Sequence, residues 1–221
     1  MTDFARAVQD ILAAGQRMDA RGWVPATAGN ISRKLDDGRI ALTRSGGHKG
    51  FLQAQDIITV DANGKPHRPE DRPSAETLLH CQIYQMDPTA GAVLHGHSVA
   101  STVLSMVEKG PALYLSDYEV LKVFEGQSTH ATTVPVPLFD NDQDIARLAT
   151  VVAPSFGAMP AGYIIRGHGV YVWGKDMPTA LARLEGLEFL LACALERRKL
   201  GVLAFFTPFR TLNLSRLDWL H

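Results

Sequence analysis

The sequence has few cysteines and no long apolar run, and both features narrow the class of protein. Cys81 and Cys193 are the only cysteines among 221 residues. Both fall in apolar helical patterns, which indicates buried thiols rather than a disulfide framework. The opening segment MTDFARAVQDILAAGQ carries acidic residues and breaks its apolar run too early for a signal peptide. No stretch of about eighteen apolar residues occurs, so we expect a soluble, cytoplasmic protein without a membrane span.

An excess of charge of one sign is also absent. The chain has 22 basic and 23 acidic residues and a formal net charge of -1, so no overall field attracts a nucleic acid backbone or an anionic membrane. We therefore expect neither nucleic acid nor a membrane as a partner, and an anionic ligand must be bound by a local site. Hydrophobic residues make up 46% of the chain, which suits the core of one globular domain.

Apolar periodicity predicts helices alternating with short strands. Apolar residues at three- and four-residue steps predict helices over 3–20, 74–87, 98–110, 117–126, 143–153 and 178–199. Ser74 and Ser98 are the expected N-caps of the second and third helices. Strand patterns flank DDG and the NG of DIITVDANGKPHR, fill 91–97, and surround Gly167 and Gly169. TTVPVPLF is β-like, and its two prolines favour an edge strand. This order predicts a mixed or antiparallel sheet covered by helices in layers.

Two histidines stand one residue apart in the apolar segment GAVLHGHSVAST, residues 91–102. In an extended strand alternate side chains share a face, so His95 and His97 project together and suit one metal ion. His168 in IIRGHGVYVWG is the best candidate for a third ligand, because it follows a hydrophobic strand and lies between two glycines. The pattern alone leaves two interpretations open: a metal site, or hydrogen-bonded core histidines with His168 in a plain turn.

Two glycine-containing segments and two glutamates are further candidates. PATAGNISRK and LTRSGGHKG combine glycine, small polar residues and cationic groups, which is the chemistry of a phosphate cradle but also that of ordinary turns. Glu76 lies near a predicted helix N-terminus and Glu119 lies in SDYEVLKVF. Without a function, Glu76 is explained as a complement to the helix dipole and Glu119 as a solvated helical residue. Either becomes a candidate proton-transfer group if it lies beside a bound metal.

Five motifs in order along the chain resemble the class II aldolase/adducin family. They are GNIS (29–32), TRSG (43–46), PSAE (73–76), HGH (95–97) and RGHG (166–169). The resemblance covers about residues 5–200. It implies an α/β fold with three α/β/α layers around a central mixed, mainly antiparallel sheet, with residues 1–200 as the catalytic domain. The tail, residues 201–221, has no recognised counterpart or role.

The resemblance also implies a cofactor, a partner and site residues. A divalent metal, most often Zn2+, would be held by His95, His97 and His168, and the subunits commonly form a homotetramer with sites near the interfaces. The substrate phosphate would be bound by Gly29, Asn30, Thr43, Ser45 and Gly46.

Longer matches resemble the dehydratase branch of this family. They are RGWVPATAGNIS, LTRSGGHKG, PSAETLLH and DYEVLKVFEGQSTH. The implied reaction is loss of water from 5-methylthio-ribulose 1-phosphate to give 5-methylthio-2,3-dioxopentyl 1-phosphate. Proton transfer is assigned to Glu119 by this resemblance, with Glu76 as a metal-proximal or supporting carboxylate.

Two other functions are compatible with the same fold. A sugar-phosphate aldolase or epimerase would use the same metal and a similar enediolate, and differs in its products. A non-catalytic, adducin-like binding module would lack the metal histidines. All three histidines are present in this chain, which favours an enzyme.

Overall fold

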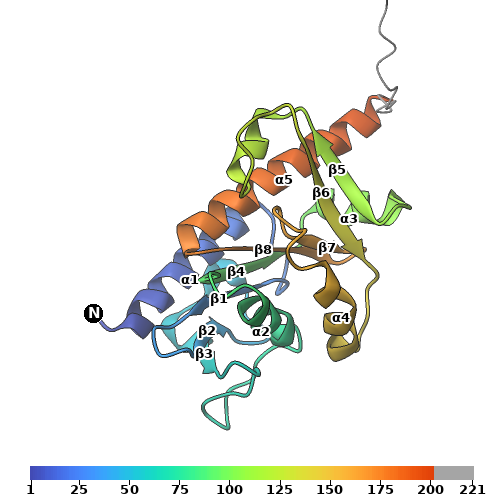
Figure 1. The fold of residues 1–221 in the computed structure, drawn as a ribbon. Coiled ribbons are helices and arrows are strands. Elements are labelled where there is room, and N and C mark those ends of the chain that lie inside the picture. The colour runs from blue at the N-terminus through green and yellow to red at the C-terminus, as the bar shows by residue number, and fades with distance from the viewer. Residues whose placement is uncertain (202–221) are drawn as a thin grey trace, which may run out of the picture.

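The computed structural model describes residues 1–201, in which helices cover both faces of one sheet (Figure 1). The strands are β1 (Asn30–Lys34), β2 (Ile40–Thr43), β3 (Ile57–Val60), β4 (Ala92–Gly96), β5 (Ala112–Ser116), β6 (Thr133–Phe139), β7 (Tyr163–Ile165) and β8 (Gly169–Gly174). The α-helices are α1 (Asp3–Ala20), α2 (Thr77–Met86), α3 (Val99–Val107), α4 (Ile145–Val152) and α5 (Met177–Lys199). Short 3-10 helices are η1 (Lys49–Phe51), η2 (Ala54–Asp56), η3 (Glu119–Val123) and η4 (Ala153–Ser155).

The strands are ordered β3-β2-β1-β4-β8-β7-β6-β5. Within the described residues β6 and β7 pair in parallel, and the other neighbouring strands pair antiparallel. The sheet is therefore mixed and mainly antiparallel. This confirms the predicted three-layer α/β/α fold.

Each face of the sheet has its own apolar core. Helices α1, α3 and α5 pack on one face together with Leu94 of β4. Helices α2 and α4 pack on the other face with Val93 and Tyr171, and both lie below β8 and β7 in the view of Figure 1. Since neighbouring strand residues point to opposite faces, His95 shares the face of Val93, and its ring stacks on Tyr171 with centroids 4.0 Å apart.

The long helices follow the predicted pattern closely. Helix α1 has Thr2 as its N-cap, whose hydroxyl accepts a hydrogen bond from the Ala5 amide. Helix α5 is capped by Asp176, whose carboxylate accepts a hydrogen bond from the Thr179 amide, and it has Pro178 in its first turn.

No helix among residues 1–201 is long and apolar enough to span a membrane. The prediction about the tail falls almost entirely on residues 202–221, which lie outside the described residues.

Some local predictions are wrong. Strand β6 is not at an edge, because it lies between β7 and β5, and β5 is an edge strand that the sequence pattern did not reveal. Pro135 and Pro137 face Tyr114 and Ala112 in the β5 pairing, whereas β7 pairs only with residues 138–139. The amide of Leu138 donates a hydrogen bond to the carbonyl oxygen of Pro111, on the β5 side of strand β6. Because amide directions alternate along a strand, the nitrogens of Pro135 and Pro137, which carry no hydrogen, point to the opposite side of β6. On that side β7 does not extend as far as these two prolines.

Candidate metal centre and adjoining pocket

Three histidines from neighbouring strands meet on the face covered by α2. His95 lies in β4, His97 follows that strand, and His168 lies in the turn between β7 and β8. Their ligand nitrogens all lie within 4.8 Å of one another. The pairing of β4 with β8 sets His95 opposite Tyr171, and this register brings the turn with His168 to the end of β4. The structure thus brings together the three histidines that the sequence predicted as ligands.

Gly169 permits this close approach of the two strands. A Cβ atom built at this position would lie 2.2 Å from the carbonyl oxygen of Gly96 and 3.1 Å from the ring of His95. Any larger residue would therefore push β8 away from β4. The RGHG motif therefore needs its second glycine for packing, whereas its first glycine, Gly167, adopts the positive φ of +62° in the turn.

The ring nitrogens are arranged for a cation. His95 Nδ1 lies 2.8 Å from the Val170 carbonyl oxygen, and because that oxygen can only accept, Nδ1 carries the proton and Nε2 keeps its lone pair. The buried Nε2 atoms of His95 and His97 have no hydrogen-bond partner among the described residues. Unpartnered buried nitrogens at one point are costly unless a ligand satisfies them, so these residues fit a divalent metal.

The environment keeps the imidazoles of His95 and His97 neutral. Burial lowers the pKa of His95 well below its usual 6.5, and the nearby His97 and His168 lower it further. Burial and the proximity of His168 also lower the pKa of His97 to about 4, although Glu76 opposes this shift. Neutral imidazole is the form that binds metals, so protons do not compete with a cation here near neutral pH.

Glu76 lies directly beside the histidines. Its carboxylate oxygens lie 2.9 Å from His168 Nε2 and 3.8 Å from His95 Nε2. Burial raises the pKa of Glu76, but the hydrogen bond from His168 and the neighbouring imidazoles outweigh burial, and the net pKa lies below the usual 4.5. The carboxylate is therefore ionised at neutral pH and available as a base.

The start of α2 explains this orientation and corrects one prediction. Ser74 is not the N-cap: Glu76 occupies that position without a side-chain capping bond, and the helix begins at Thr77. The hydroxyl of Ser74 instead accepts from the Glu76 amide at 3.4 Å, in a turn that precedes the helix. The Glu76 carboxylate is thus free to face the histidines.

A pocket of about 350 Å³ adjoins Glu76 and His97. Its lining residues come from the loop before β1 and the start of that strand, the segment from β2 into η1, the turn before α2 and the residue after β4: Thr27, Ala28, Gly29, Asn30, Ser45, Gly46, Lys49, Ser74, Glu76 and His97. The two predicted glycine-containing segments therefore meet beside the candidate metal ligand His97. Gly29 adopts φ +81°, and a Cβ there would lie 2.7 Å from the His95 carbonyl oxygen, which ties this loop to the ligand strand.

Thr43 supports this pocket rather than lining it. Its side chain is fully buried, and its hydroxyl accepts a hydrogen bond from the Ile31 amide at 3.3 Å. Thr43 is not among the residues that line the pocket, and its predicted contact with the phosphate stays a prediction. Lys49 and Ser74 are pocket residues that sequence reasoning missed. The signal for Lys49 was present in LTRSGGHKG, but a lysine in a polar loop is usually exposed.

A buried polar network lies behind Glu76. His80, one helical turn after Glu76, is fully buried, and its Nδ1 lies 2.7 Å from the Ser32 hydroxyl. Ser32 also lies 2.9 Å from the Tyr84 hydroxyl. Burial lowers the pKa of His80 to about 4, with an opposing contribution from Glu76. This network joins α2 to β1 and fixes the first turn of α2 on the sheet.

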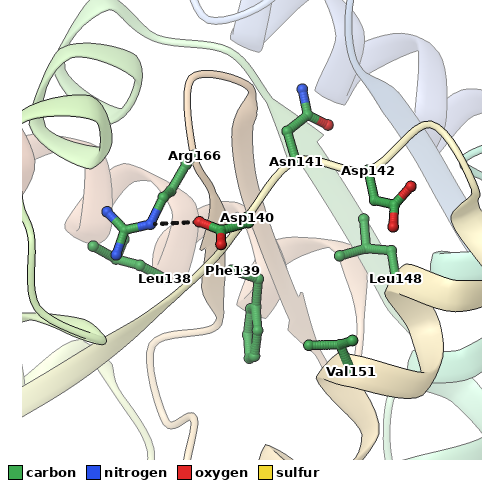
Figure 2. A pocket seen from close by; sticks show the side chains of 8 residues that line it. All are labelled: Leu138, Phe139, Asp140, Asn141, Asp142, Leu148, Val151 and Arg166. Carbon is green, nitrogen blue, oxygen red and sulfur yellow. Dashed lines mark ion pairs between the residues drawn. The ribbon is translucent and has the colours of Figure 1, made fainter.

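His168 is held by the turn that follows β6. Asn141 Oδ1 lies 3.3 Å from His168 Nδ1, the kind of outer contact that orients a metal ligand. Figure 2 shows the neighbouring pocket, where Arg166 pairs with Asp140 at 3.1 Å. Arg166 also donates to the Ser105 carbonyl at 2.8 Å, which fastens the RGHG turn to α3.

Glu119 makes its contacts with residues outside the candidate metal centre. It begins η3, its side chain is 70% exposed, and its ion-pair partners are Lys122 and His130. Val123 of η3 packs against Gly186 of α5. No contact in the described part of the chain joins Glu119 to His95, His97 or His168, so its role in proton transfer stays a prediction.

Comparison with known families matches this arrangement of motifs. Residues 9–195 match the class II aldolase and adducin N-terminal domain. The chain belongs to this family. Family membership accounts for the order of the five motifs and for the fold, and it confirms the resemblance inferred from the sequence.

Curated relatives and solved structures extend this result. The methylthioribulose-1-phosphate dehydratase of Gluconacetobacter diazotrophicus is 74% identical over 198 residues, covering 90% of this chain and 97% of that protein. The protein of the same name from Gluconobacter oxydans is 68% identical, with 88% and 93% covered. YgbL of Klebsiella pneumoniae superposes with a TM-score of 0.76 at 26% identity, covering 89% of this chain and 91% of that one. An L-fuculose-1-phosphate aldolase of Thermus thermophilus shares the fold, with a TM-score of 0.73 at 24% identity and 90% and 98% covered.

Proposed function

We propose that this class II aldolase family member is a methylthioribulose-1-phosphate dehydratase. It would convert 5-methylthio-ribulose 1-phosphate to 5-methylthio-2,3-dioxopentyl 1-phosphate and water, as a step of methionine salvage in the cytoplasm. The observation that carries the proposal is the meeting of three histidines, one ionised carboxylate and a glycine-lined pocket. The names of relatives 74% and 68% identical to the chain support the substrate.

We propose His95, His97 and His168 as the ligands of one divalent metal per subunit, with Zn2+ as the favoured ion. Three imidazoles are a common donor set for catalytic zinc, which leaves a coordination position open. When bound, the ion would act as a Lewis acid that stabilises negative charge on sugar oxygens. The assembly we propose is a homotetramer.

The chain's own groups would then handle two protons. Dehydration removes the proton on C3 and delivers a proton to the C4 hydroxyl, which leaves as water, and the resulting enol tautomerises to the diketone. Glu76 is placed to hold or move a proton beside the histidines, since its carboxylate is ionised and 2.9 Å from His168. Glu119 remains the predicted second proton-transfer group. Asn30, Ser45 and the neighbouring loop amides would bind the phosphate.

Product identity tests this function. Purified protein loaded with zinc is given 5-methylthio-ribulose 1-phosphate, and the product is identified by mass. A product lighter by one water, with the absorbance of a diketone, supports the dehydratase. Dihydroxyacetone phosphate and an aldehyde would show an aldolase instead, and an unchanged substrate would refute both.

A further inference from the structure

Lys49 is a lysine buried in the wall of the pocket. Only 1% of the surface of Lys49 is exposed, although this lysine lies in a polar segment at the start of η1. Helix α1 holds its backbone closely: a Cβ built at Gly15 would lie 2.3 Å from the Lys49 carbonyl oxygen. The glycine in the middle of α1 therefore has a packing reason, and the position of Lys49 is fixed from behind.

The ammonium of Lys49 joins the two glycine-containing loops. Its Nζ donates to the carbonyl oxygen of Thr27 at 2.7 Å and to that of Gly47 at 2.6 Å. An ammonium has three N–H donors, so these two acceptors leave one donor for another partner. The loops before β1 and after β2 thus meet at a charged group instead of at a neutral turn.

Lys49 is also the single lysine or arginine among the residues that line this pocket. Burial lowers the pKa of Lys49 to about 8, while the carboxylate of Glu76 opposes that shift. Glu76 is itself engaged by His168 at 2.9 Å, so it is not a dedicated partner of the lysine. Among residues 1–201 no carboxylate forms an ion pair with Lys49. A buried ammonium without such a partner is costly, and an anionic ligand in the pocket offsets that cost.

We propose that the free N–H of the Lys49 ammonium contacts the phosphate of the substrate, in the cradle formed by Gly29, Asn30, Ser45 and Gly46. The inference rests on the proposed function and adds to it the residue that supplies charge. The neutral donors of the loops set the shape of the cradle, while Lys49 selects a dianion and keeps both loops in place. Lys49 would therefore discriminate a phosphorylated sugar from the free sugar.

The test compares Lys49→Met with Lys49→Arg, which keeps the charge, and with Lys65→Met at an exposed lysine outside the pocket. Inorganic phosphate is the probe, measured as a competitive inhibitor of the metal-loaded enzyme and by calorimetry. A charge-assisted hydrogen bond predicts that Lys49→Met weakens phosphate binding and raises KM by about 10- to 100-fold, with a smaller effect on kcat. Lys49→Arg should retain part of the affinity, and Lys65→Met should behave as the wild type.

Unchanged phosphate affinity in a folded Lys49→Met variant overturns the proposal. So does a fall in kcat alone, which would assign Lys49 to proton transfer with Glu76. If Lys49→Met does not fold, the 13Cε resonance of Lys49 in the wild type is followed as inorganic phosphate is added, and the absence of a shift refutes the contact. Failure of the proposed function is distinguishable, because phosphate binding is measured without turnover of the methylthio sugar.

Discussion

Glu76→Gln is the substitution that separates the carboxylate's chemistry from its place in the structure. Glutamine has nearly the same shape and can still accept a hydrogen bond from His168, which lies 2.9 Å from the carboxylate, but it cannot take up a proton. Removal of a positioned acid–base group lowers rates by about 10²- to 10⁴-fold, or roughly 3 to 5 kcal/mol of activation free energy. We expect kcat to fall by that amount, while the three histidines keep their metal.

The assay follows diketone formation at saturating substrate, and the metal content of each preparation is measured by mass spectrometry. Glu119→Gln is the matched variant, because Glu119 is 70% exposed and pairs with Lys122 and His130. The geometry predicts the larger loss for Glu76→Gln, whereas the family resemblance predicts it for Glu119→Gln. Near-normal turnover of Glu76→Gln with a full complement of metal would refute the reasoning from geometry.

Other predictions concern the support of the site. Asn141→Ala should weaken zinc binding by about 10- to 100-fold, because His168 loses its outer contact; a zinc titration against a chelator measures this. Gly169→Ala should lower the unfolding free energy by about 1–3 kcal/mol or more in urea, since its Cβ would lie 2.2 Å from the Gly96 oxygen. In the folded protein burial lowers the pKa of His80 from the usual 6.5 to about 4. Between these two pH values the imidazole of His80 therefore takes up a proton in the unfolded chain but not in the folded protein. The unfolding free energy of the wild type should therefore fall relative to His80→Asn as the pH drops from about 7 to about 5, and parallel pH curves for the two proteins would contradict it.

Much of the fold could be predicted because its signals are local. Apolar residues at helical steps mark α1, and Asp176 with Pro178 marks the start of α5. The glycine of a tight turn marks the β1–β2 hairpin. Strand β5 escaped prediction because its short segment alternates only partly, with Tyr114 exposed and its neighbours buried. The prolines of β6 indicated an edge, but local patterns cannot say which strand lies beside another.

The candidate site could likewise be predicted only in part from the sequence. The spacing of His95 and His97 places both on one side of a strand, and that much follows from backbone geometry alone. Their proximity to His168 depends on the pairing of β4 with β8. The local sequence predicted Ser74 as the N-cap of α2. In the structure the helix begins at Thr77 instead, and the Glu76 carboxylate faces the imidazoles.

The sequence by itself therefore determined the family, the residue types of the site and the order of most helices and strands other than β5, because motifs and periodicity are properties of neighbouring residues. Only the tertiary structure decided which carboxylate touches the histidines, that Thr43 is turned inward, and that Lys49 is buried between two loops. Burial and contact depend on segments that are distant in the chain, and it is burial that keeps His97 neutral and lowers the pKa of Lys49 to about 8.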